Sequence, residues 1–116
     1  MYEVSHNDNV RQVRLFPNSD FDLITCSDDQ TVKLWQRGET IKTLEHSEWC
    51  WRFDLDETNG LLAVATNYGV TVWQMDDFSK VVEVKIDDTR DVRFNKDATK
   101  ILAVESSGEV HEISLR

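Results

Sequence analysis

Three side chains in the first third of the chain have the types that a hydrolytic triad uses. They are His6, Thr25 and Asp29, and a triad joins such groups so that the imidazole activates the hydroxyl. Thr is a weak nucleophile unless an N-terminal amine activates it, and no oxyanion-hole signature accompanies these residues. The sequence therefore predicts no catalytic residues, and the chain is not expected to be an enzyme.

Metal binding is the second chemistry to test. Cys26, Cys50, His6 and His46 could each supply a zinc ligand, but they lack the close sequence pairing that zinc sites usually show. Cys26 lies in an expected strand and Cys50 directly precedes one, which favours small core residues in a reducing compartment, although a disulfide between them stays open. His111 is expected to be an ordinary surface or packing residue. No metal site is predicted.

Cofactor binding has no signal in the sequence. There is no Gly-rich phosphate cradle, no Cys-x-x-Cys pair and no calcium loop. Neighbouring carboxylates cluster at expected strand ends, where they are turn formers and solubilising charge rather than acid–base pairs: Asp54, Asp56, Glu57, Asp76, Asp77, Asp87 and Asp88. We therefore expect no cofactor.

The composition is that of one small globular domain of 116 residues, 40% of them hydrophobic. The formal net charge of −9 argues against a nucleic-acid or anionic-membrane surface, because both need clustered Lys and Arg. No apolar run is long enough to span a membrane, and the first ten residues lack a signal-peptide core. A cytoplasmic or otherwise intracellular location is expected.

The elements that must position these side chains are short β-strands. Residues 27–36 (SDDQTVKLWQ) place a polar corner before a strand that alternates apolar and polar residues, and residues 23–26 form a β-branched run before it, so a hairpin is predicted. Similar segments begin at residues 50 and 89. Landmarks recur at intervals of about forty residues: Leu15, Leu55 and Phe94; Leu23, Leu61 and Ile101; Trp35, Trp73 and Ile113.

Each repeat divides into strands separated by turn-forming residues. The expected strands are 10–16, 21–26, 31–36 and 40–45, then 51–55, 61–66, 70–74 and 81–86, and finally 91–94, 100–104 and 109–115. Residues 1–5 form one more β-capable stretch. Ankyrin and TPR repeats are excluded because no amphipathic helical pattern is present.

A strand, an Asp-bearing turn and a strand that ends in Trp resemble the WD-repeat β-propeller family, and the resemblance covers nearly the whole chain. It implies an all-β fold of propeller blades, each with four antiparallel strands. The blades would be residues 6–45, 46–86 and 87–116, with three strands in the last. Residues 1–5 would be an outer strand that completes the last blade.

Three blades cannot close a ring, because propellers have about four to eight. An uncovered apolar face of roughly 500 Å² forgoes about 12 kcal/mol of burial, which is comparable with the whole stability of a domain, about 5–15 kcal/mol. A lone chain is therefore expected to be insoluble or molten. Either identical chains associate as a homo-oligomer, with a six-bladed dimer favoured, or the chain is part of a larger propeller.

The resemblance also implies a structural tetrad of His6, Thr25, Asp29 and Trp35. Asp29 would accept from the imidazole, the imidazole would meet Thr25, and the Trp35 indole would donate to the Thr25 hydroxyl, so that every buried polar group has a partner. The later repeats depart from the tetrad at the aligned positions, which are Ala63 and Asn67 in the second repeat and Lys85 and Ile113 in the third.

In this family, the loops entering the innermost strands lie on the face that receives partners. Exposed aromatic side chains there would be typical hot-spot residues, although Trp51 could instead continue the core face of Phe53 and Leu55. For the charged residues, a solvated rim is the alternative. The residues expected to bind a partner are Asn9, Arg11, Asp28, Trp49, Trp51, Tyr68, Asp88 and Arg90.

What the family implies for function is a non-catalytic scaffold that binds a protein or peptide, although a fold alone does not dictate function. One alternative is a propeller fragment or engineered unit whose main property is closing a ring by strand exchange. Another is a substrate receptor within a larger complex, such as a ubiquitin ligase. In each case the partner is a protein, not a nucleic acid or a membrane.

Overall fold

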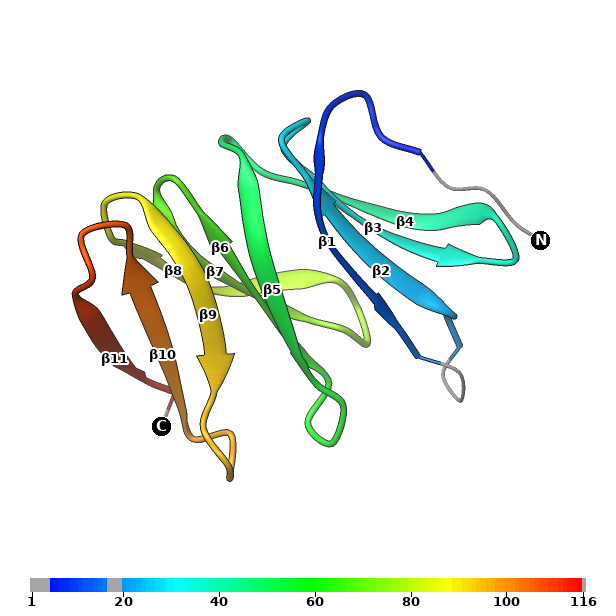
Figure 1. The fold of residues 1–116 in the computed structure, drawn as a ribbon. Helices are drawn as coiled ribbons and strands as arrows, with labels where there is room; N and C mark the ends of the chain where they lie inside the picture. Colours follow the sequence, from blue (N-terminus) through cyan, green and yellow to red (C-terminus); the bar gives the residue numbers. More distant parts are fainter. Residues whose placement is uncertain (1–4, 17–19, 116) are drawn as a thin grey trace. The chain divides into compact units, whose positions relative to one another are not determined.

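The computed structural model describes residues 5–16 and 20–115, and these residues form eleven β-strands and no helix. Figure 1 shows the strands grouped in three antiparallel sheets. Across the described ranges, no helix exists that could cross a membrane. The all-β prediction is confirmed. Four of the five residues of the expected N-terminal strand, 1–4, lie outside the described residues, and Ser5 is not in a strand.

The first compact unit, residues 1–50, holds a sheet in which the strands follow their sequence order. Its strands are β1 (Val10–Leu15), β2 (Leu23–Ser27), β3 (Thr31–Gln36) and β4 (Glu39–Glu45). In the β2–β3 hairpin Leu23 pairs with Trp35 and Cys26 with Val32. The polar corner at residues 28–30 is therefore the turn of the hairpin, and Gln30 adopts a positive φ of 74° there.

The second compact unit, residues 51–116, holds most of the second sheet and the whole of the third. The second sheet contains β5 (Cys50–Asp56), β6 (Leu61–Thr66), β7 (Gly69–Gln74) and β8 (Ser79–Lys85). The third contains β9 (Thr89–Phe94), β10 (Lys100–Glu105) and β11 (Val110–Ser114), with β10 in the middle. Within the described residues, the last sheet thus has three strands.

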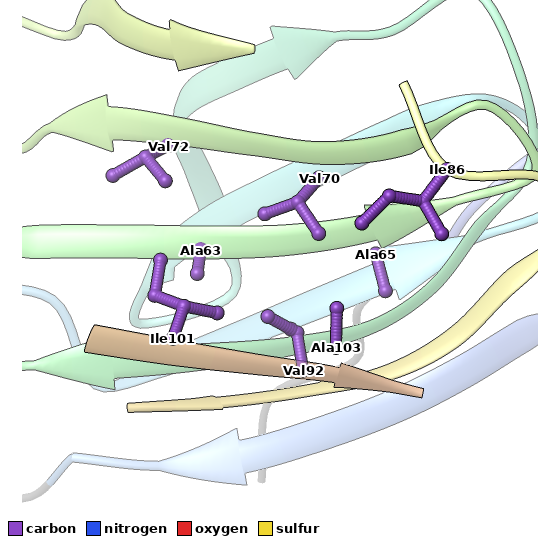
Figure 2. Close-up of a cluster of buried hydrophobic side chains, with 8 residues drawn as sticks. All are labelled: Ala63, Ala65, Val70, Val72, Ile86, Val92, Ile101 and Ala103. Carbon is purple, nitrogen blue, oxygen red and sulfur yellow. The ribbon is translucent and has the colours of Figure 1, made fainter. Parts of the chain in front are cut away.

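A core of small and branched side chains joins the second and third sheets. Figure 2 shows the side chains of β6 and β7 facing those of β9 and β10. The members are Ala63, Ala65, Val70, Val72, Ile86, Val92, Ile101 and Ala103, and none is more than 8% exposed. Alanines on β6 leave room for the branched residues of the facing sheet. Full burial of each valine or isoleucine contributes about 1.5–3 kcal/mol, so this core holds the two sheets together.

A polar contact supplements that core at the innermost strands. The Asp54 carboxylate on β5 accepts a hydrogen bond of 2.8 Å from the backbone N–H of Phe94 on β9. The turn between β6 and β7 is linked to the chain entering β9 in the same way, because the Asp88 backbone N–H donates to the Asn67 carbonyl at 2.8 Å. These bonds fix the turns of one sheet beside the entry loop of the next.

Candidate functional site

The β2–β3 hairpin of the first unit holds a relay of four hydrogen-bonded side chains. His6 donates from Nδ1 to Asp29 Oδ2 at 2.9 Å, and its Nε2 lies 2.5 Å from Thr25 Oγ1. The Trp35 indole N–H donates to Thr25 Oγ1 at 2.9 Å. If the Thr25 hydroxyl donates to Nε2, every group in the relay has a partner. The structure thus brings the four tetrad residues together.

The relay is closed to solvent, and its polar groups form hydrogen bonds with one another. The side chain of His6 is 0% exposed, and Thr25 is buried. Burial alone would raise the pKa of Asp29, but hydrogen bonds from the Thr31 hydroxyl, the Asn7 backbone N–H and His6 outweigh it and lower the pKa to about 2. A substrate cannot reach these groups, so their role is to hold the loop before β1 against the hairpin.

A second charged pair lies beside the relay. Arg11 donates from Nε to Asp28 Oδ1 at 2.7 Å and from Nη2 to Oδ2 at 2.5 Å. Asp28 is only 5% exposed, and the hydrogen bonds from Arg11 lower its pKa against the effect of burial. The Asn9 carbonyl accepts from the Asp28 backbone N–H at 2.9 Å. Three of the expected partner-binding residues are therefore in contact with one another.

In the second unit, four side chains form what we call the Trp51 cluster: Asn67, Trp51, Arg90 and Asp88. The Trp51 indole N–H donates to Asn67 Oδ1 at 2.5 Å. The Arg90 guanidinium lies 3.9 Å from the centre of a Trp51 ring. Arg90 also donates from Nε and Nη2 to the two oxygens of Asp88, at 2.9 and 3.1 Å. These hydrogen bonds lower the pKa of Asp88.

The cluster leaves its members partly accessible. Trp51 is half-buried and Arg90 is exposed, so Trp51 is neither a fully enclosed core residue nor a fully exposed one. Tyr68, the neighbour of Asn67 in the turn, is 58% exposed. Trp49 in the first unit is 44% exposed. Trp49 and Tyr68 are thus exposed, and Trp51 is partly exposed.

The pairing register corrects two alignments between the repeats, and the first is that Leu62 rather than Leu61 takes the place of Leu23. In the β2–β3 and β6–β7 hairpins, the Trp of the second strand pairs with a Leu of the first, and this pair fixes which residues are equivalent. By this register Val64, not Ala63, takes the place of Thr25. The β6–β7 turn is one residue shorter than the β2–β3 turn, so a count back from the Trp reaches the wrong residue. The second sheet still lacks the hydroxyl of the relay.

The same shift changes the role of Asn67. It takes the place of Asp28 rather than Asp29, and it accepts from Trp51 as Asp28 accepts from Arg11. Trp51 and Arg11 are each the second residue of an innermost strand. Asn67 is thus a site residue that sequence reasoning assigned to another role. The sequence signal that could have identified this role is the length of the β6–β7 turn, which is one residue shorter than the β2–β3 turn.

Comparisons with known proteins agree with this architecture. Residues 2–36 match the family model described as WD domain, G-beta repeat. The solved C-terminal WD40 domain of Sif2 superposes with a TM-score of 0.80 at 17% identity, over 97% of this chain and 33% of that one. The chain therefore has the fold of WD40 propeller blades, and residues 2–36 are similar to a WD repeat.

The similar curated proteins are much longer than the matching segment. The EARP-interacting protein homolog of Gekko japonicus is 32% identical over 69 residues, which cover 56% of this chain and 18% of that protein. The human EARP and GARP complex-interacting protein 1 is 35% identical over 66 residues, or 53% of this chain and 17% of that protein. The rat protein of the same name is 42% identical over 53 residues, or 42% and 14%. The matched region spans less than a fifth of each relative.

Proposed function

We propose that this chain is a non-catalytic scaffold that binds a protein or peptide on the surface around the Trp51 cluster, formed by the start of β5, the β6–β7 turn and the start of β9. The Trp51 cluster is the observation that carries the proposal. Its indole and guanidinium are already stacked and hydrogen-bonded, so little side-chain freedom is lost when a partner docks. Trp, Tyr and Arg are also the residue types that dominate binding energy at interfaces.

The partner class follows from the relatives and from charge. The relatives are named as proteins that interact with the EARP and GARP complexes, and we propose an intracellular protein assembly of that kind as the first partner to test. The net charge of −9 disfavours a nucleic-acid or anionic-membrane partner. A substrate-receptor role in a larger complex is one form of the same function, and no described residue points to a ubiquitin ligase in particular.

Substitution of the exposed aromatic residues tests this proposal. Capture of purified EARP complex by the immobilised chain is measured for the wild type, Trp49→Ala and Tyr68→Ala. Each variant is expected to lower the affinity by at least about tenfold, as hot-spot truncations do, while the melting temperature stays nearly unchanged. Val81→Ala is the matched control, because Val81 is 50% exposed on the outer strand β8.

Two outcomes would count against the binding surface. One is equal capture by the wild type and both aromatic variants. The other is an equal loss with Val81→Ala. Arg11→Ala is not a suitable variant, because it would also leave the buried Asp28 carboxylate without its ion-pair partner and so destabilise the fold.

A second candidate function, self-assembly into a closed ring, is supported by one specific observation. Phe53, Val92 and Val13 are each the fourth residue of an innermost strand, in β5, β9 and β1. Phe53 and Val92 are buried, but Val13 is 57% exposed. Leu15 on the same strand is 75% exposed. Leu102 and Val110 of the third sheet are exposed as well. We propose that the third sheet of a second copy covers the exposed residues of β1.

A further inference from the structure

The turn between β10 and β11 carries three side chains of the types that bind metal ions. They are Glu105, Glu109 and His111, and their ligand atoms all lie within 4.8 Å of one another. The Glu105 backbone N–H donates to the Glu109 carbonyl at 2.9 Å, and the Gly108 N–H donates to the Glu105 carbonyl at 3.0 Å. The backbone of the hairpin therefore fixes the positions from which the three side chains extend.

We propose that this hairpin binds one divalent transition-metal ion, with Zn²⁺ as the best-fitting species, through Glu105, Glu109 and His111. An imidazole and carboxylates are typical zinc ligands, and open zinc sites use three protein ligands with water in the fourth position. The imidazole argues against Mg²⁺ and Ca²⁺, which prefer oxygen ligands. Within the described ranges, this is the one group of such residues close enough to share an ion.

The distances fit an ion after a small adjustment. His111 Nε2 is 2.5 Å from Glu105 Oε2 and 3.8 Å from Glu109 Oε2. Tetrahedral zinc with bonds of about 2.0–2.1 Å holds its ligand atoms about 3.3 Å apart. Relative to His111 Nε2, each carboxylate oxygen therefore needs to shift by less than about 1 Å. The Glu109 side chain is 73% exposed and has room to do so.

A neighbouring cavity would leave the ion accessible. Glu105 and His111 also line a cavity of about 490 Å³ between the β8–β9 connection and β11. Lys85, Asp87 and Glu112 also line it, while the Glu112 carboxylate is paired with Lys100 Nζ at 2.8 Å. The fourth coordination position of the ion would face water there.

Calorimetric titration of the full chain with ZnCl₂, in a buffer free of chelators, tests the proposal. The wild type is expected to bind one Zn²⁺ per chain and to give no comparable heat with MgCl₂. His111→Ala should lower the zinc affinity at least about tenfold, because even the loss of an outer partner of a metal site costs about 10–100-fold. Glu109→Gln should also weaken binding, and this exposed residue can be changed without disturbing the core.

Glu112→Gln is the matched control. It removes the same charge as Glu109→Gln from the same hairpin, but the Glu112 carboxylate pairs with Lys100 Nζ at 2.8 Å and is not one of the three proposed ligands. The proposal predicts unchanged zinc affinity for this variant, with circular dichroism verifying that every variant keeps the β-sheet spectrum. Absence of zinc binding by the wild type overturns the site. So does unchanged affinity in His111→Ala, or an equal loss in Glu112→Gln.

Discussion

The hydroxyl of Thr25 is the centre of the relay in the first sheet, because both His6 and Trp35 form hydrogen bonds with it. Thr25→Val keeps the shape of the side chain, and Val64 is the equivalent residue in the second sheet. The Trp35 indole N–H and one nitrogen of the His6 imidazole then lose their hydrogen-bond partner. We expect the free energy of unfolding to fall by about 1–3 kcal/mol, measured by denaturant titration. Thr40→Val, at an exposed position on β4, is the control. Equal stability of the two variants would contradict the relay.

The low pKa of Asp29 predicts a loss of stability in acid. Its pKa is about 2 in the folded chain against an ordinary value of 3.8, so the ionised carboxylate stabilises the fold above about pH 4 and this contribution disappears as the pH falls toward 2. At about 1.4 kcal/mol per pKa unit, the contribution is on the order of 2 kcal/mol. Asp29→Asn should therefore be less stable than the wild type at pH 5, and the gap should narrow toward pH 2.

Denaturant unfolding at several pH values measures this gap. If the difference in the free energy of unfolding between the wild type and Asp29→Asn stays constant from pH 5 to pH 2, the charge of the Asp29 carboxylate does not stabilise the fold.

At the scale of elements, Gly69 is a position that no other residue can occupy without strain. It begins β7 with a φ of +145°. A Cβ at this position would lie 1.9 Å from the Val84 carbonyl oxygen and 2.7 Å from the Ile86 backbone nitrogen. Because both atoms belong to the backbone, Gly69→Ala must displace the pairing of β7 with β8, and we expect a destabilisation above about 4 kcal/mol, an exceptional size for one substitution.

Gly108 provides the comparison for this prediction. It also has a positive φ, of +97°, but a Cβ there meets no atom within 4 Å. Gly108→Ala therefore adds backbone strain without a clash and should cost about 1–3 kcal/mol. Thermal unfolding of both variants, followed by circular dichroism, measures the difference. A Gly69→Ala protein as stable as Gly108→Ala would contradict the clash at β8.

The elements themselves could be predicted because strands and turns are local patterns. Alternation of apolar and polar residues predicts β3, and the ranges 31–36 and 61–66 agree with the observed strands. Contacts within the first repeat could also be predicted, since its residue types match the family pattern. Two features could not. The shortened β6–β7 turn shifted the role of Asn67, and the half-burial of Trp51 depends on Arg90 of another sheet.

The group proposed to bind metal was missed for a related reason. Glu109 was expected inside the last strand, but β11 begins at Val110. The side chains of Glu105 and His111 contact each other because of the register in which β10 pairs with β11. Sequence spacing alone does not give that register. Clusters that depend on the pairing of two strands are therefore harder to predict than those within one turn.

For the whole molecule, the exposed side chains of β1 predict that stability depends on protein concentration. If a second copy covers Val13 and Leu15, association stabilises the fold by mass action, and the melting temperature should rise with concentration. Light scattering should then give a closed oligomer, with a dimer expected. Leu15→Glu should remove both effects, because it places a charge where the proposed contact is apolar.

Val81→Glu is the control for that experiment, since Val81 is also exposed but lies on the outer strand β8. The control should keep the mass of the wild type and its concentration dependence. A wild-type chain that is a compact, folded monomer at every concentration would contradict self-association, because the exposed residues of β1 would then need no cover. If Leu15→Glu alone is monomeric, the innermost strand of the first sheet is the contact surface between copies.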